Sequence, residues 1–219
     1  MTLTIHAVGM LATIAVLLFA GSPDKTQINF DDAPVGKPPE GFSTALTGGG
    51  GAVAWSVVDD PTAPSGKHVL AQTSADDTDN RFPLCVFDDL TAKDVEVSVR
   101  FKPVSGKVDQ AGGIVIRYKD KDNYYITRAN ALEDNVRLYK VVKGDRKQFA
   151  GKSTKVSSNE WHTLALSARG QHFVVSFDGE KLFEADDPTF DQPGKIGLWT
   201  KADSVTHFDD LTVTILDSK

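Results

Sequence analysis

Residues 94–104, DVEVSVRFKPV, decide the fold class of this chain. Apolar side chains occupy every second position of the stretch, with polar ones between them; the apolar set is Val95, Val97, Val99 and Phe101. A period of two is typical of a β-strand, because successive side chains point to opposite faces of a sheet. The stretch is therefore predicted to be a strand with one face on a core and the other in solvent.

Similar strand signals recur along the rest of the chain, separated by turn residues. Asp178-Gly179 is a strong hairpin signal, and KDKD (119–122) and KGDR (143–146) also read as turns. A bulge at Asp209-Asp210 is expected, because it would bring Leu211 and the alternate residues after it back to the core. No stretch has a useful helical period. Roughly a dozen short strands predict an all-β, two-sheet antiparallel sandwich. The other expected strands lie within 112–118, 123–130, 135–142, 161–169, 172–185, 195–200 and 204–215.

The composition fits one globular β-domain. The 219 residues are 40% hydrophobic and 25% charged. A chain of this length can bury a sizeable core without covalent cross-links or bound metals. The formal net charge is −6, so the sequence gives no electrostatic reason to expect nucleic acid or an anionic membrane as a partner. Cys85 is the only cysteine, so no intramolecular disulfide can form, and it is expected to be a buried small hydrophobe.

The first residues differ from the rest of the chain. Residues 1–20 contain no Asp, Glu, Lys or Arg, and an apolar run ends in the small residues AGS. This pattern is typical of a secretory leader, although it has no basic n-region. We expect residues 1–22 to be a signal peptide, or an uncleaved N-terminal anchor, and residues 23–219 to be a single sandwich domain. The protein would then be exported to the periplasm or the extracellular space.

Several motifs resemble the concanavalin A-like (laminin-G-like) jelly-roll superfamily. The C-terminal half carries the resemblance in residues 159–187 and in GKIGLWTKADSVTHFDDLTV (194–213). The N-terminal half carries it in FDDAPVGKPPEGF (30–42) and in residues 93–128. Within the superfamily the chain is most similar to bacterial secreted domains grouped with the 3-keto-disaccharide hydrolases. The resemblance implies a jelly roll whose ligands lie on the concave sheet, but it does not imply one activity.

Alternation along the strands also predicts a ligand-binding face. An aromatic ring beside planar polar donors suits a sugar, and arginine side chains suit an acidic saccharide through bidentate bonds. The alternative is that these are ordinary solvated strand residues. The predicted ligand-binding residues are Arg117, Arg128, Asn130, Arg137, Trp199, Lys201 and His207.

A catalytic reading has weaker support. Glycosidases need two carboxyl groups at a fixed separation, and the Glu-x-Asp-x-x-Glu pattern of the retaining endoglucanases of this fold is absent. Glu133 and His207 are candidates for an acid–base pair, but neither is assigned a role. The sequence therefore favours a protein that is not an enzyme without deciding the question.

Metal ligands are similarly sparse. The five histidines show no zinc-like spacing, whereas Asp32 and Asp210 are weak candidates for calcium if the terminal strands lie together. No cofactor is otherwise expected.

Three classes of function remain. The first is a secreted domain that binds carbohydrate, such as a saccharide or cell-surface glycan, on its concave sheet without catalysis. The second is a carbohydrate-active hydrolase for a 3-keto-glycoside or a related saccharide. The third is a structural or adhesive surface domain. The missing carboxylate pair places the first ahead of the second.

Overall fold

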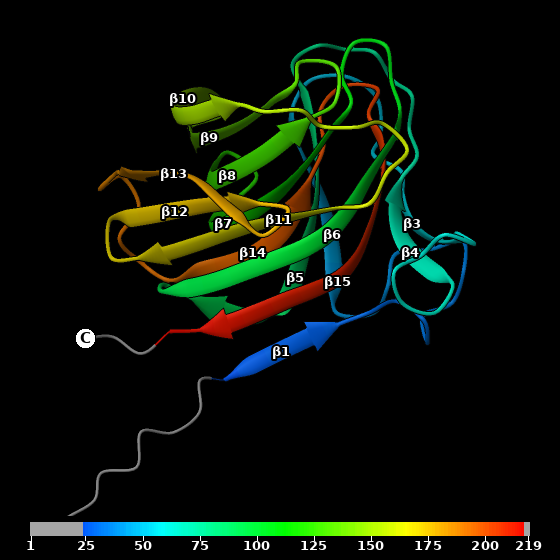
Figure 1. Cartoon of the computed structure of the whole chain (residues 1–219), viewed down its shortest axis with the longest axis horizontal. Helices are drawn as coiled ribbons and strands as arrows, with labels where there is room; N and C mark the ends of the chain where they lie inside the picture. Colours follow the sequence, from blue (N-terminus) through cyan, green and yellow to red (C-terminus); the bar gives the residue numbers. More distant parts are fainter. Residues whose placement is uncertain (1–23, 217–219) are drawn as a thin grey trace, which may run out of the picture.

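Strands and the turns between them make up the architecture. The computed structural model describes residues 24–216, and this part of the chain contains fifteen strands and no helix. All of the strand pairs are antiparallel. The strands form two sheets in separate layers (Figure 1).

The eight-stranded sheet has the order β13-β12-β11-β6-β15-β4-β3, with β1 also paired to β15. Its strands are β1 (Lys25–Ile28), β3 (Trp55–Asp59), β4 (His68–Gln72), β6 (Val95–Ser105), β11 (His162–Arg169), β12 (His172–Phe177), β13 (Glu180–Asp186) and β15 (Val205–Ile215). The seven-stranded sheet has the order β10-β9-β8-β7-β14-β5-β2. Its strands are β2 (Phe42–Gly48), β5 (Arg81–Ala92), β7 (Ala111–Asp120), β8 (Asn123–Asn130), β9 (Asn135–Val142), β10 (Asp145–Ser153) and β14 (Gly194–Trp199).

The main core lies between the two sheets. The alternating apolar residues of β6 are all buried there, as predicted, and Leu138 and Ile196 of the opposite sheet belong to the same cluster. Cys85 is also buried in it. The prediction of a two-sheet antiparallel jelly-roll sandwich is confirmed.

The turns have the backbone conformations that their residues favour. Asp178 and Gly179 have φ angles of 49° and 84°, and Lys143 and Gly144 have φ angles of 52° and 81°. Tight hairpins require positive φ angles, which glycine adopts without steric cost. The predicted bulge in β15 is also present: Asp210 has a φ angle of 48°, and the register with β6 shifts there.

The seven-stranded sheet buries a second cluster on its outward face. Ten apolar side chains form this outer cluster, among them Tyr124, Val115 and Trp199, all fully buried. No third layer covers this face in the described part of the chain, so the sheet itself must curve around the cluster. Its two edge strands support this reading, because Gly48 of β2 and Arg146 of β10 line one cavity.

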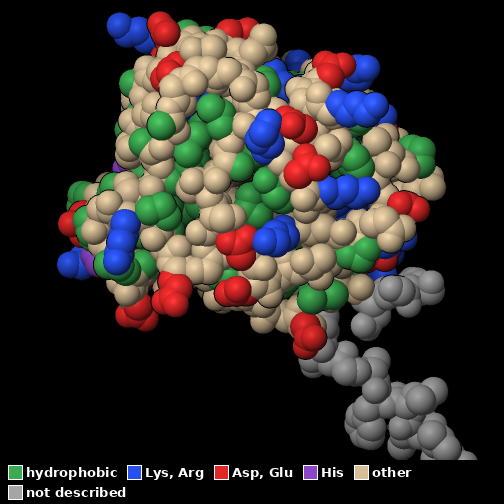
Figure 2. Space-filling model, turned by 180° about the vertical axis from the view of Figure 1, so that it is seen from behind, with side chains coloured by type: hydrophobic (Ala, Val, Ile, Leu, Met, Phe, Trp, Pro, Cys, Tyr) green, Lys and Arg blue, Asp and Glu red, His purple; other side chains and the backbone are tan. Residues whose placement is uncertain are grey.

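The surface carries both charge signs. Seen from behind, acidic and basic side chains are interspersed, and the described residues show no continuous basic patch on that face (Figure 2). Within residues 24–216 there is also no helix long and apolar enough to cross a membrane. The predicted leader, residues 1–22, lies outside the described residues.

Candidate functional site

The site forms where the curved sheet closes over its outer cluster. Trp199, the last residue of β14, stacks on Phe82 of β5 with ring centres 5.5 Å apart and planes 15° apart. Tyr139 of β9 completes this set of rings and is 7% exposed. These three buried rings form an aromatic floor on the outer face of the sheet, and polar side chains surround it.

Arg146 lies over this aromatic floor. Its guanidinium carbon is 4.6 Å from the ring centre of Phe82, 4.5 Å from that of Tyr139 and 5.6 Å from that of Trp199. Such contacts stabilise a cation and fix the plane of the guanidinium. The cavity next to it has a volume of about 320 Å³ and is lined by Gly48, Asn80, Phe82, Gly144, Asp145 and Arg146.

A second polar group lies on the other side of Tyr139. Arg128 donates to the Tyr139 hydroxyl at 3.1 Å and to Glu133 at 2.7 Å, and it also bonds Asn135. Its side chain is 5% exposed, whereas that of Glu133 is 47% exposed. Burial alone would raise the pKa of Glu133, but Arg128 and Asn135 outweigh it and hold this pKa below its ordinary value.

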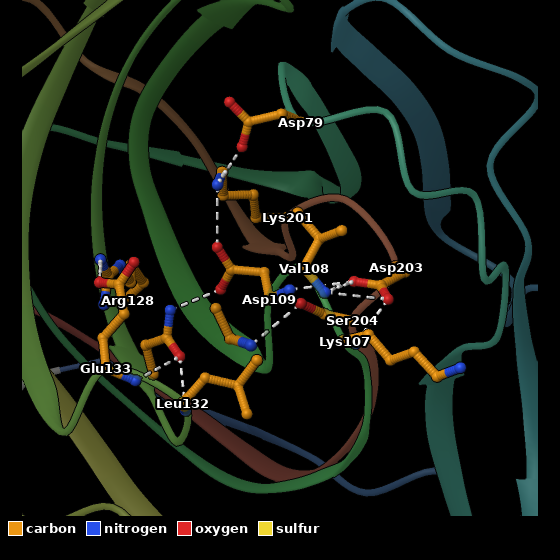
Figure 3. Close-up of polar contacts among 12 residues, drawn as sticks. Asp79, Lys107, Val108, Asp109, Arg128, Leu132, Glu133, Lys201, Asp203 and Ser204 are labelled. Carbon is orange, nitrogen blue, oxygen red and sulfur yellow. Dashed lines mark hydrogen bonds and ion pairs between the residues drawn. The ribbon is translucent and has the colours of Figure 1, made fainter.

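A buried carboxylate joins this group to the end of β14. Asp109 is 1% exposed, accepts a hydrogen bond from Asn130, and lies 3.0 Å from the ammonium of Lys201. Lys201 continues to the exposed Asp79 at 2.6 Å, so the four side chains form one chain of contacts (Figure 3). Burial raises the pKa of Asp109 more than Lys201 lowers it.

The loop that carries Asp109 is held in place by the carboxylate of Asp203. The carboxylate of Asp203 accepts hydrogen bonds from the backbone N–H groups of Lys107, Val108 and Asp109, at 2.6 to 3.2 Å (Figure 3). Burial raises the pKa of Asp203, but these three donors outweigh it and keep the pKa low. The position of Asp109 is thus fixed by the segment that follows β14.

Five of the seven predicted ligand-binding residues lie on this face of the sheet. Arg128 and Arg137 are directly opposite each other on β8 and β9, so they share a face. The remaining three of this group are Asn130, Trp199 and Lys201. Whether these residues bind a ligand remains a prediction.

Trp199 does not offer the open stacking surface that the sequence predicted. Its exposed fraction is 0%, because Phe82 and Arg146 lie against the indole. The ring therefore supports the floor of the site and cannot itself stack on a sugar.

Arg117 was expected on this face and lies elsewhere. It has a φ angle of 49°, and the pairing of β7 with β8 loses register after Ile116. This bulge reverses the alternation, and the Arg117 guanidinium donates to the carbonyls of Lys93, Gly170 and Phe190. Arg117 therefore holds three loops together and does not belong to the site.

His207 also lies away from the site, because β15 belongs to the other sheet. Its Nδ1 is 2.7 Å from the carboxylate of Asp60, which also bonds Lys102. The chain crosses between the sheets after Trp199, so the expectation that the two residues share one face was wrong. The proposed pairing of Glu133 with His207 is not formed either, because each bonds to other residues on different sheets.

The calcium candidates do not form a metal cluster. β1 and β15 pair as expected, with Ile28 opposite Leu211. Asp32 lines a shallow cavity near the start of the chain, and the backbone N–H of Asp210 bonds the carboxylate of Asp209. Among residues 24–216 there is no group of three or more His, Cys, Asp or Glu side chains placed to hold a metal ion.

The sequence did not reveal Asp79, Phe82, Asp109, Asn135 or Arg146 as site residues. Arg146 was read as part of a turn, although Gly144 in that turn is a hairpin signal that places Arg146 at the start of a new strand. Asp79 and Asp109 belong to loops, and no local pattern connects them to Lys201.

Comparisons with known proteins agree with this architecture. Over 105 residues the chain is 29% identical to levanase of Bacillus subtilis; the match takes in 47% of this chain and 15% of the enzyme, so the chain spans only a small part of its length. The solved carbohydrate-binding module CBM66 of Bacillus subtilis has a TM-score of 0.65 at 20% identity, covering 83% of this chain and 99% of the module. The β-glucanase of Bacillus licheniformis has a TM-score of 0.52 at 14% identity, covering 90% and 100%. At these identities the solved structures show a common fold alone.

The family comparison extends over almost all of the described chain. The model of the 3-keto-alpha-glucoside-1,2-lyase-like domain matches residues 30–214, which agrees with the resemblance seen in the sequence. The chain therefore belongs to the 3-keto-alpha-glucoside-1,2-lyase-like domain family.

Proposed function

We propose that this chain is an exported carbohydrate-binding domain that holds a saccharide on the outer, hollow face of its seven-stranded sheet. The observation that carries the proposal is the ring of polar side chains around the Phe82, Tyr139 and Trp199 floor. Sugars bind where hydroxyl groups meet fixed polar donors and acceptors beside aromatic surface. Fold likeness to a carbohydrate-binding module supports the same reading.

The carboxylate of Glu133 is 47% exposed and thus open to a ligand hydroxyl. Arg128 and Asn135 fix its position, so it can accept a hydrogen bond with little loss of side-chain freedom. We expect the purified protein to retain a subset of saccharides on a glycan array, and Glu133→Gln to weaken that retention about tenfold. Glu96→Gln is the matched control, because Glu96 is an exposed residue of β6 in the other sheet. The proposal would be refuted if no saccharide on the array bound the protein, or if both variants lost binding equally.

A second candidate is a carbohydrate-active hydrolase for a 3-keto-glycoside or a related saccharide. The favouring observation is that one site holds two carboxyl groups whose pKa values are pushed apart, upward for Asp109 by burial and downward for Glu133 chiefly by Arg128 against the effect of burial. Such a pair can supply an acid and a base. It ranks second because Asp109 is 1% exposed and already bonds Asn130 and Lys201. Incubation of the protein with a 3-keto-glucoside tests this candidate. Consumption of the substrate by the unaltered protein, abolished in Glu133→Gln, would support catalysis. If the substrate is unchanged, the protein does not hydrolyse that 3-keto-glucoside.

A further inference from the structure

Arg146 is a cation that lacks an anionic partner in the described part of the chain. Its contacts there are with aromatic rings, and its Nη1 atom is buried without a hydrogen-bond partner. Burial lowers the pKa of Arg146 and the nearby Arg128 adds to this effect, whereas Tyr139 and the carboxylate of Asp109 act in the opposite direction. A guanidinium removed from water without an anion is costly, so an incoming anion would gain more there than at the open surface.

The other charged groups nearby are already committed. Lys201 bonds Asp79 and Asp109, and Arg128 bonds Glu133. Lys201 shares one charge between two carboxylates, so Asp79 and Asp109 also act on Arg146 at longer range, but neither forms an ion pair with its guanidinium.

The carboxylate nearest to Arg146 in sequence does not neutralise it either. Asp145 lines the same cavity, but its carboxylate is 67% exposed and pairs with Lys147 at 3.2 Å. Arg137, on the same face as Tyr139, also has no ion pair among the described residues. The cations around the site therefore outnumber its carboxylates by one, five (Arg128, Arg137, Arg146, Lys147 and Lys201) against four (Asp79, Asp109, Glu133 and Asp145), in a protein whose formal net charge is −6.

The geometry of the cavity restricts what kind of anion fits. Stacking on Phe82 and Tyr139 fixes the guanidinium plane, and a planar fork of donors matches the two oxygens of a carboxylate. The cavity of about 320 Å³ is lined by Arg146 together with Phe82 and with Gly48 of the opposite edge strand. It continues the face that the proposed function assigns to saccharide.

We propose that Arg146 binds the carboxylate of an acidic sugar, so that the saccharide class held on this face is uronate-containing. This inference rests on the proposed function and names its ligand class. The Arg146 guanidinium would form two parallel N–H···O bonds to the carboxylate, while the sugar ring occupies the adjoining cavity.

A matched pair of ligands tests the inference. The probes are a trimer of galacturonic acid and its methyl ester, which share rings and hydroxyls but differ in charge. We expect the intact protein to bind the acid at least tenfold more tightly than the ester by calorimetry, with a preference that shrinks as salt is added. Equal binding of acid and ester by the unaltered protein would overturn the inference.

Variants locate the effect at one residue. Arg146→Gln should remove the preference, so that acid and ester bind with similar affinity, and Arg146→Lys should keep only part of it, because an ammonium lacks the planar fork. Lys152→Gln is the control: it removes the same charge from an exposed position of the same strand, β10. A preference that survives Arg146→Gln would contradict the assignment. If that variant fails to fold, Arg146→Lys and the acid–ester comparison still decide.

Three further outcomes separate the hypotheses. A sulfated neutral trimer that binds more tightly than the uronate would overturn the carboxylate in favour of a sulfate ester. If the protein binds neutral saccharides but not the acid, the uronate inference is wrong and the proposed function stands. Failure of every saccharide, acidic or neutral, would remove the proposed function as well.

Discussion

The ammonium of Lys201 lies 3.0 Å from the carboxylate of Asp109, which is 1% exposed. The lysine side chain is 12% exposed, so both charges are largely withdrawn from water. Breaking such a pair leaves an uncompensated charge, which is more costly than losing a surface ion pair.

Lys201→Met should therefore lower the free energy of unfolding by about 3 kcal/mol at neutral pH. This loss of stability should become smaller as the pH falls toward about 4, where carboxyl groups begin to take up protons. Burial raises the pKa of Asp109, and loss of Lys201 raises it further, so the folded variant takes up a proton that relieves the unpaired charge. Urea unfolding at the two pH values measures the change. Lys147→Met, on the exposed surface, should change stability by less than about 0.5 kcal/mol. A deficit independent of pH would show that Asp109 is not the cause.

His207 provides a pH test on the other sheet. Burial lowers the pKa of His207 more than its bond to Asp60 raises it. A histidine whose folded pKa is depressed takes up a proton more readily when unfolded, so it makes stability fall as the pH drops below about 6.5.

The titration midpoint of His207 by NMR should thus lie below about 6.5. His207→Gln should flatten the stability–pH curve in that range and leave saccharide binding unchanged, since the residue lies on the eight-stranded sheet. A midpoint above the ordinary value, or lost saccharide binding in this variant, would contradict this placement.

Gly194 permits the close contact of β14 with β7. A methyl group at this position would lie 2.4 Å from the carbonyl carbon of Arg117 and 2.7 Å from its Cα, which are backbone atoms that cannot rotate away. Gly194→Ala should therefore lower stability by about 1 to 3 kcal/mol. At Gly49 the nearest atom would be 4.0 Å away, so Gly49→Ala serves as the control with little effect. Thermal unfolding of both variants measures the difference, and equal midpoints would show that the strands separate freely.

Local patterns predict the sheets well and the site only in part. The alternation in residues 95–101 and the Asp178-Gly179 turn are local signals, and both were correct. Arg117 was misplaced because one residue in a positive-φ bulge reverses the side-chain direction, which alternation cannot indicate. His207 was misplaced because a change of sheet after Trp199 has no signature in the periodicity.

The missed residues illustrate the same limit. Asp109 and Lys201 are far apart in the sequence, and their pairing depends on how Asp203 holds the loop between β6 and β7. Arg146 became part of the site because curvature brings β10 toward β2. These are consequences of tertiary structure, whereas the strands that carry them are consequences of local sequence.

Gly48 and Arg146 come from the two outermost strands of their sheet, yet they border a common cavity. A ligand bound in this cavity would contact both edge strands at once. Edge strands are normally the first part of a sheet to open, so occupancy would slow amide hydrogen exchange along β2 and β10 together rather than at one of them.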